Sequence, residues 1–269
     1  MNLILFRKSL VEKEELNIAK KYFSITFNRT AVGLDDLIIG RYSCLPYYKE
    51  LESDLKIVGA KLINSFQEHQ YVADLQNWYD DFEDITPKTW FLLSDVPKIE
   101  IGPFVLKGET NSRKFEWDTH MFAENRNKAT DVYIRLQQDG LVGFQKIYVR
   151  KYIPLKTYYQ KDVPHNLPIT KEFRFFILDN KVLAGGYYWA NYVDQLIEDG
   201  HLPDPREVPE ALLQDVIKRV DGRIRFYVVD VAQDIFERWW IIELNDGQMS
   251  GLCNVNPDLL YKNLLENLS

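Results

Sequence analysis

Short apolar runs and amphipathic segments alternate along the first third of the chain, and this order constrains the fold more than any other feature. Strands and helices are expected in succession at Met1–Phe6, Glu12–Phe23, Asp36–Gly40, Tyr47–Val58 and Lys61–Asn64, followed by a helix from Asn64 or Ser65 through Tyr79. Alternation of this kind is typical of a parallel sheet whose strands are joined by crossover helices. The sequence therefore predicts a small α/β domain over residues 1–93.

The pattern changes from about Ile99 onward, where strands follow one another directly. Strands are expected at Pro103–Lys107 and Ile147–Ile153, two hairpins follow, and helices are expected at Pro209–Val220 and Asp258–Asn267. The hairpins join Glu172–Leu178 to Lys181–Tyr188 across Asp179–Asn180, and Arg225–Val231 to Arg238–Leu244. We therefore expect an α/β fold in which the later residues form α+β lobes.

Composition excludes several classes of function. The 33 Lys and Arg residues against 40 Asp and Glu residues give a net charge of −7, which argues against non-specific binding of duplex nucleic acid. Cys44 and Cys253 cannot form a disulfide scaffold, which favours a reducing, cytoplasmic compartment. No apolar stretch approaches the roughly 18–20 residues that span a bilayer. We expect neither a nucleic-acid partner nor a membrane partner.

Acidic residues inside apolar strands are the most informative side chains. Asp230 lies in VVDVA, and Glu243 and Asn245 lie in IIELN, where alternation places them on one face together with Ile241. If the second hairpin turns near Phe236–Glu237, Asp230 faces Glu243. Two carboxylates and an amide oxygen are hard ligands suited to Mg²⁺. The alternative is an edge strand whose acids face solvent.

Cationic residues lie on other strands of the same region. Lys107 ends PFVLK, Arg150 lies in IYVRKYI, and Arg174 shares a face with Glu172 in EFRFF. Each could be a strand-end charge or half of an ion pair. Together with the acids, however, they meet the needs of a magnesium–triphosphate, whose oxygens require both cations and metal. Neither a GxxxxGK[ST] loop nor a GxGxxG motif is present.

The order of these motifs resembles the ATP-grasp superfamily. A strand lysine with a polar loop after it (FVLKGETNSRKF) precedes a hinge strand, an upstream Asp and a late Glu-x-Asn triplet. The arginine-bearing hinge strand and EFRFF are similar to a divergent arginine- and lysine-rich clade found in bacteria and phages, and the translation-factor assembly proteins of eukaryotes share the EFR and late acids. The resemblance implies an ATP-grasp domain over residues 94–269 that holds a nucleotide between a smaller lobe (94–153) and a larger lobe (154–269). Residues 1–93 look like the preceding domain of such enzymes.

The resemblance also implies roles for individual residues. Lys107 would contact the nucleotide α- and β-phosphates, and Lys114, at the end of the mobile loop Gly108–Lys114, would be a second phosphate contact. The backbone of Lys151, Tyr152 and Ile153 would bind adenine. Arg150 and Arg174 would stabilise the γ-phosphoryl group or an acyl-phosphate. Asp230, Glu243 and Asn245 would hold two Mg²⁺ ions, and Glu172 would orient Arg174 or bind the ribose or metal.

Three function classes remain open. The first is an ATP- and Mg-dependent ligase that activates a carboxylate as an acyl-phosphate and joins it to an amine or similar nucleophile. The second is an ATP-binding assembly factor or chaperone without ligation, and the third is a carbohydrate or nucleotide kinase. Arg41 follows a strand end of the α/β region, where ligands tend to bind, and we expect it to face the second substrate unless it is a surface arginine.

Overall fold

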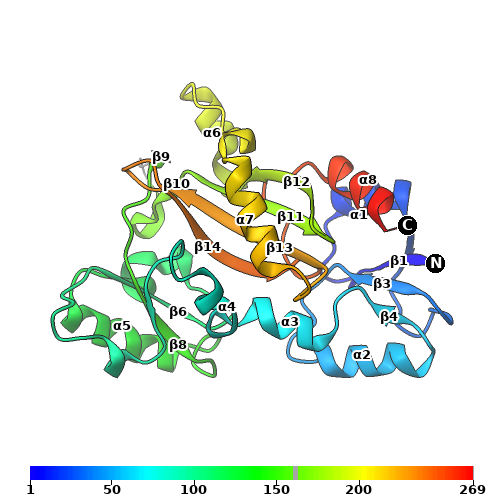
Figure 1. Ribbon diagram of the computed structural model, residues 1–269, viewed down its shortest axis with the longest axis horizontal. Helices are drawn as coiled ribbons and strands as arrows, with labels where there is room; N and C mark the ends of the chain where they lie inside the picture. Colours follow the sequence, from blue (N-terminus) through cyan, green and yellow to red (C-terminus); the bar gives the residue numbers. More distant parts are fainter. Residues whose placement is uncertain (160–162, 269) are drawn as a thin grey trace.

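Three four-stranded sheets lie around a common centre in the computed structural model (Figure 1). The structure describes residues 1–159 and 163–268, so residues 160–162 and 269 of the predicted larger lobe lie outside the described part. Within this part, a parallel sheet comes from the N-terminal region, a smaller antiparallel sheet from the middle, and a larger antiparallel sheet from the C-terminal third.

The N-terminal sheet is parallel, as predicted. Its strands lie in the order β2-β1-β3-β4, and each neighbouring pair runs in the same direction. The elements are β1 (Asn2–Leu5), α1 (Lys13–Tyr22), β2 (Ser24–Thr26), β3 (Leu37–Gly40), α2 (Tyr48–Ile57) and β4 (Lys61–Leu62). Strand β2 was not predicted, because its three residues follow α1 after one residue and form no separate apolar run.

Two helices replace the single helix expected after Ser65. They are α3 (Phe66–Ala73) and α4 (Leu75–Phe82), separated at Asp74, whose extended backbone ends one helix while its carboxylate caps the next. Ser65 and Glu68 cap the start of α3 reciprocally. Both helices pack into the core of the larger sheet, so the chain leaves the N-terminal sheet before the predicted boundary at residue 93.

The smaller lobe is an antiparallel sheet of order β5-β8-β6-β7 with one long helix beside it. Its elements are β5 (Thr89–Trp90), β6 (Phe104–Gly108), β7 (Phe122–Ala123), α5 (Arg126–Gln138) and β8 (Ile147–Lys151). Asn125 caps α5, and Ala129, Val132 and Leu136 bury one side of it. Strand β5 lies within residues 1–93, which were predicted to form the N-terminal domain, yet it pairs in the smaller lobe. The domain limits stay a prediction.

The larger sheet has the order β12-β11-β13-β14, with every neighbouring pair antiparallel. Both predicted hairpins are present, and Asp179 and Asn180 have positive φ angles of 43° and 67°, as a tight hairpin turn requires. The elements of this lobe are β9 (Thr157–Tyr159), β10 (Ile169–Thr170), β11 (Glu172–Leu178), β12 (Lys181–Tyr187), α6 (Val193–Glu198), α7 (Glu210–Val220), β13 (Phe226–Gln233), β14 (Trp239–Asp246) and α8 (Pro257–Asn267). Strands β9 and β10 pair with each other, apart from this sheet.

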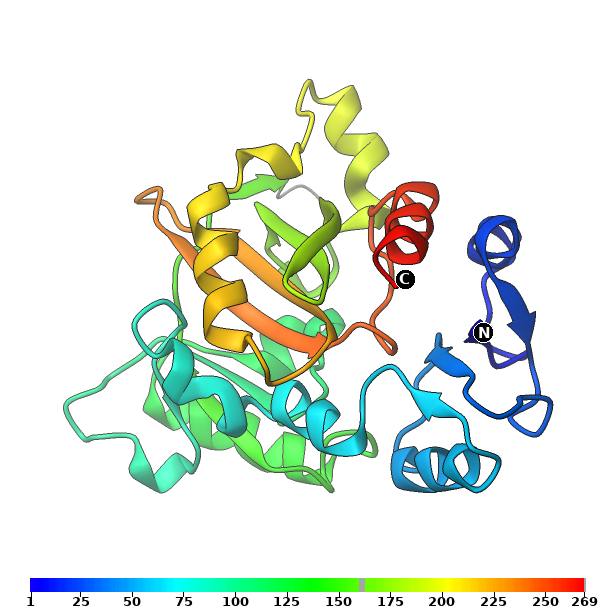
Figure 2. The same ribbon diagram turned by 45° about the vertical axis from the view of Figure 1, so that its right-hand side comes forward.

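The two faces of the larger sheet differ in chemistry. One face is apolar and packs against α3, α4 and α7; its buried side chains include Phe173, Phe175, Ile177, Tyr227, Val229, Val231 and Ile241. Figure 2 shows α7 lying across this side of the strands. The opposite face packs Phe176 and Val228 against α8 and the N-terminal strands. Farther along the same strands, that face carries Glu172, Arg174 and Asp230, whose side chains alternate with the apolar ones.

A β-bulge changes which side chains of β14 share a face. Asp230 pairs with Glu243, but the next pair is Val231 with Ile241, which leaves Ile242 as an extra residue. Ile241 therefore packs in the apolar core, and the prediction that it shares a face with Glu243 and Asn245 is wrong. Bulges of this kind re-aim side chains at the edge of a site.

The helices of the described residues give no membrane span. None of them is both long enough and apolar enough to cross a bilayer.

Candidate active site

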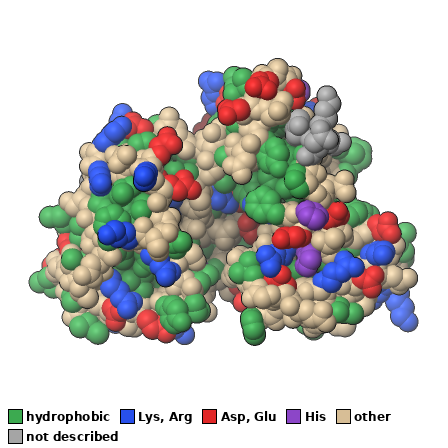
Figure 3. Space-filling model, turned by 180° about the vertical axis from the view of Figure 1, so that it is seen from behind, with side chains coloured by type: hydrophobic (Ala, Val, Ile, Leu, Met, Phe, Trp, Pro, Cys, Tyr) green, Lys and Arg blue, Asp and Glu red, His purple; other side chains and the backbone are tan. Residues whose placement is uncertain are grey.

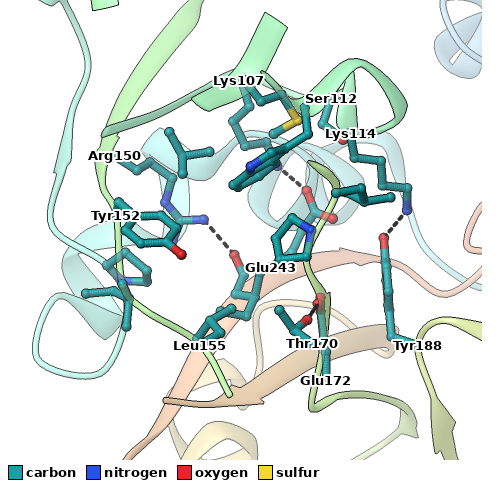
Figure 4. A pocket seen from close by; sticks show the side chains of 18 of the residues that line it. Lys107, Ser112, Lys114, Arg150, Tyr152, Leu155, Thr170, Glu172, Tyr188 and Glu243 are labelled. Atoms are coloured by element: carbon teal, nitrogen blue, oxygen red, sulfur yellow. Dashed lines mark hydrogen bonds and ion pairs between the residues drawn. The ribbon is translucent and has the colours of Figure 1, made fainter. Parts of the chain in front are cut away.

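A pocket lies between the smaller and larger sheets, with walls from β6, β8, β11, the end of β12 and β14 (Figure 4). The space within its walls is about 950 Å³ when the open solvent at its mouth is included. The lining residues are Pro87, Val105, Lys107, Ser112, Lys114, Trp117, Met121, Arg150, Lys151, Tyr152, Ile153, Leu155, Leu167, Pro168, Thr170, Glu172, Tyr188, Trp189, Ile242 and Glu243. From behind, the molecule is visibly hollowed down its middle (Figure 3).

Most of the predicted nucleotide residues meet in this pocket. Apolar side chains line one part of it, and charged side chains gather at Glu243. Figure 4 shows Arg150 and Tyr152 toward one end, Lys114 and Tyr188 at the other, and Glu243 between them. The pocket therefore has a hinge end and a loop end.

Three charged side chains form a row across the larger sheet. Arg174 is the cross-strand partner of Asp230, and Asp230 is the partner of Glu243, as expected from the hairpin. The Arg174 Nε and Nη2 atoms donate to the two carboxylate oxygens of Asp230 at 2.8 and 2.7 Å. Asp230 is 1% exposed, and its burial raises the pKa of its carboxyl, although Arg174 opposes this. Arg174 is thus held in place by a buried ion pair.

Lys107 and Glu243 form the contact between the lobes at the centre of the pocket. The Lys107 ammonium, from β6, donates to Glu243 Oε1 on β14. Burial alone would raise the pKa of Glu243, but the nearby Lys107 charge and its hydrogen bond hold it below its usual value. The Glu243 side chain keeps 22% of its surface exposed, so this carboxylate remains accessible to a ligand.

Arg150 lines the pocket, but its guanidinium is bound to the protein. It donates to the hydroxyls of Thr86 and Thr89 and, at 2.8 Å, to the carbonyl of the bulged Ile242. Burial lowers the pKa of Arg150 to about 10, partly offset by Glu243. These hydrogen bonds connect β8 to β14. Arg150 would have to give up one of them to contact a phosphoryl group, and that contact stays a prediction.

The hinge residues Lys151, Tyr152 and Ile153 line the pocket as predicted. The N–H groups of Lys151 and Tyr152 already donate to the carbonyls of Lys88 and Pro103, at 2.8 and 3.0 Å. A backbone contact to a base from this segment would therefore use the carbonyls or the Ile153 amide.

The loop after β6 is folded over the pocket. The Gln145 side-chain oxygen accepts from the amides of Thr110 and Asn111 at its base. Its far end is linked to the larger lobe, because the Lys114 ammonium donates to the Tyr188 hydroxyl. The predicted mobile loop is thus in contact with both lobes.

Glu172 is a buried carboxyl that faces the pocket. The Thr170 hydroxyl donates to it at 2.9 Å, and the Trp189 indole N–H donates to the same hydroxyl. Burial, reinforced by the charge of Asp230, raises the pKa of Glu172 to about 8. The carboxyl is therefore largely protonated at neutral pH.

This protonation predicts a pH dependence of stability. Between its ordinary pKa of 4.5 and about 8, the folded state holds a proton that the unfolded chain releases. The free energy of unfolding therefore falls as pH rises through this window, by at most about 1.4 kcal/mol per pH unit for one group. Glu172→Gln should flatten this slope in urea unfolding between pH 5 and 8. Identical slopes in both proteins would contradict the shift.

The donor set at the row of charges fits magnesium only with help from a ligand. Among the described residues, no group of three or more His, Cys, Asp and Glu side chains could hold a metal by itself. Glu243 is accessible, Asn245 lies on the same face, and both oxygens of Asp230 are engaged by Arg174. Mg²⁺ commonly takes one or two protein carboxylates and completes its shell with phosphate oxygens and water. Glu243 and Asn245 suit that arrangement, with Asp230 behind them.

Arg41 does not line this pocket. Its guanidinium is buried, pairs with Glu15 at 2.8 Å, and donates to the carbonyls of Gly247 and Ser250. It thus ties the N-terminal sheet to the segment after β14. Because these contacts use its donors, we leave Arg41 out of the proposed site.

Several lining residues were not predicted as site residues. Tyr188 and Trp189, which directly follow β12, are two of them. Thr170 could have been found from the sequence, because it lies two positions before Glu172, a spacing that puts two side chains of extended backbone on the same side. The aromatic pair carried no comparable signal, since tyrosine and tryptophan most often mark a core.

The comparisons with known proteins agree with this geometry. A family model described as an ATP-grasp domain, R(2)K clade family 3, matches residues 98–264. No curated protein matches the sequence.

Solved structures share the fold over nearly the whole chain. D-cycloserine synthetase DcsG is 11% identical, with a TM-score of 0.60 and complete coverage of both chains. D-alanine–D-alanine ligase from Bacillus anthracis, solved with ATP, is 11% identical with a TM-score of 0.58, over 98% of this chain and 95% of that one. Cdc123 from Schizosaccharomyces pombe is 17% identical over 66% of this chain and 84% of its own, but its TM-score of 0.44 supports no argument.

Proposed function

Because the chain belongs to family 3 of the R(2)K clade of ATP-grasp domains, we propose that it is an ATP- and Mg-dependent ligase. It would activate a carboxylate as an acyl-phosphate and join it to an amine or similar nucleophile. The observation that carries this proposal is the pocket between the lobes, where Lys107 and Glu243 meet. The fold shared with two ligases supports it.

The proposed orientation of the nucleotide follows the two ends of the pocket. Adenine would lie at the hinge end among apolar side chains such as Val105, Ile153 and Leu155. The phosphates would extend toward Lys107 and Lys114, whose ammonium groups neutralise phosphate charge. Glu243 and Asn245, backed by Asp230, would hold magnesium, which would neutralise phosphate charge.

Attack of the carboxylate on the γ-phosphorus needs positioning and charge neutralisation more than covalent help from the protein. Arg174 would take the second role. Its guanidinium is bound by Asp230 and by the Gly251 carbonyl and does not line the pocket, so this role would require exchange of one of these bonds. The carboxylate gains a phosphoryl group, ADP leaves, and the nucleophile then displaces phosphate.

Removing the Lys107 charge should test the nucleotide site directly. We expect Lys107→Met to weaken binding of a non-hydrolysable Mg-ATP analogue by about 10- to 150-fold, the loss of about 1.5–3 kcal/mol for a charged hydrogen bond. Isothermal titration calorimetry measures this. The control is Lys88→Met, which should leave the affinity unchanged. The Lys88 side chain is 55% exposed, and its ammonium pairs with Glu100. Equal affinities in all three proteins would contradict the proposal.

The alternatives differ in what stimulates ADP release. A ligase releases ADP when both a carboxylate and an amine are supplied, whereas a kinase needs only a hydroxyl acceptor. An assembly factor binds nucleotide and a protein partner without forming a product. A metabolite screen that measures ADP release therefore separates the three.

A further inference from the structure

Two aromatic rings form a corner at the loop end of the pocket. Tyr188 and Trp189 lie with their ring centroids 5.1 Å apart and their planes at 79°. Trp189 is held by its hydrogen bond to Thr170, and both residues line the pocket. Aromatic rings that are already held in place present their negative faces to a ligand, and little side-chain entropy is lost when the ligand binds.

An ammonium group already lies in this corner. The Lys114 Nζ atom is 4.3 Å from the Tyr188 ring centroid and 5.4 Å from that of Trp189. It also donates to the Tyr188 hydroxyl, and the Arg174 guanidinium carbon lies 5.1 Å from the same Tyr188 centroid. A cation within about 6 Å of a ring centroid is attracted by the ring quadrupole. Glu172 and Glu243 line the same pocket as Lys114, Glu172 as a buried carboxyl and Glu243 in contact with Lys107. The contacts of the Lys114 ammonium indicate how the alkylammonium group of a ligand would be bound in this corner.

The position of the corner relates it to the reaction. In Figure 4, Tyr188 and Lys114 lie at the end of the pocket away from Arg150 and Tyr152. With adenine at the hinge, the phosphates and the activated carboxylate would point toward this end. A nucleophile must approach there, and a primary amine arrives at neutral pH as an ammonium ion. It gives up one proton to solvent before its nitrogen attacks the acyl-phosphate carbon, and a second proton leaves with the departing phosphate.

We propose that Tyr188 and Trp189 form the subsite that receives the ammonium group of the acceptor, and that the acceptor is therefore a primary alkylamine, free or on a peptide. This inference rests on the proposed ligase function. Lys114 occupies the same corner, so the acceptor and the Lys114 side chain compete for it.

The test uses n-butylammonium as the probe and 1-butanol as its neutral match, with the full chain in magnesium and a non-hydrolysable ATP analogue. Ligand-observed NMR titration measures both affinities. We expect the wild type to prefer butylammonium by about 5- to 30-fold, the effect of a partly desolvated cation–π contact. Tyr188→Leu should lose that preference and Tyr188→Phe should keep it. Without the analogue, when Lys114 stays in the corner, Lys114→Met should bind the probe several-fold more tightly than the wild type.

A matched control removes an ammonium from another aromatic ring. The Lys49 Nζ atom lies 4.6 Å from the Phe66 ring centroid in the N-terminal region, and Lys49→Met should not change probe binding. Equal affinity for butylammonium and butanol, or a Tyr188→Leu variant that keeps the preference, overturns the subsite. Displacement of the probe by Mg²⁺ in wild type and Tyr188→Leu alike also overturns it, because the ammonium would then replace a metal at the carboxylates. Calorimetry of the nucleotide analogue in the same samples shows separately whether the proposed function fails.

Discussion

Glu243→Gln is expected to weaken Mg-nucleotide binding by about 10- to 150-fold, because it removes the one accessible carboxylate of the charged row (roughly 1.5–3 kcal/mol). The amide keeps the size of the side chain but supplies no negative charge for a cation. Calorimetry with a non-hydrolysable ATP analogue in magnesium measures the change. Thermal unfolding of the same samples checks that the fold is intact.

The same variant should behave differently without metal. In the wild type, Glu243 accepts from the Lys107 ammonium and competes with phosphates for it. With EDTA present, Glu243→Gln should therefore bind the metal-free nucleotide as tightly as the wild type or more tightly. A loss of equal size with and without magnesium would assign Glu243 to general packing and remove it from the metal site.

Local patterns predicted one pair of the charged row, because strand alternation and a turn near Phe236–Glu237 place Asp230 opposite Glu243. The structure confirms this pair, although it is reached through the bulge, since the pairs nearer the turn are shifted by one residue. The position of Arg174 beside Asp230 was not predicted. The parallel N-terminal sheet was predictable for a similar reason, since alternating strands and helices leave few other topologies.

The bulge at Ile242 was not predictable from the same strand. IIEL reads as regular alternation, and what favours the extra residue is its carbonyl contact with Arg150, 92 positions earlier. Arg41 shows the same limit, because its carbonyl partners lie more than 200 positions later in the chain. Long-range partners decide whether an arginine in a strand pattern faces a ligand or holds two segments together.

Helix α5 is a different case, because its signals were present. Asn125 is a good N-cap, and Ala129, Val132 and Leu136 follow at helical spacing. Its other residues are mostly polar, because only one narrow side of the helix packs on the small sheet. With so few apolar residues, the helical spacing was not recognised in the sequence.

Asp230→Ala should cause the largest loss of stability of any single substitution considered for this chain, about 3–5 kcal/mol in the free energy of unfolding. The reason is that Arg174 would keep its charge while only 7% of its side chain is exposed, with no carboxylate opposite it. Urea unfolding at pH 7 measures the difference.

A second aspartate provides the matched control. Asp179 also accepts two hydrogen bonds from one arginine, Arg225, at 2.9 and 2.6 Å. That pair is about 40% exposed on both sides, and exposed pairs contribute about 0–1 kcal/mol. Because Asp179 has a positive φ angle, which Asn tolerates better than Ala, the control is Asp179→Asn, and it should cost no more than about 1 kcal/mol. Adding Arg174→Met to Asp230→Ala should recover part of the lost free energy of unfolding, because no unpaired charge remains buried. A double variant that is less stable than Asp230→Ala alone would show that Arg174 stabilises the sheet through contacts other than Asp230.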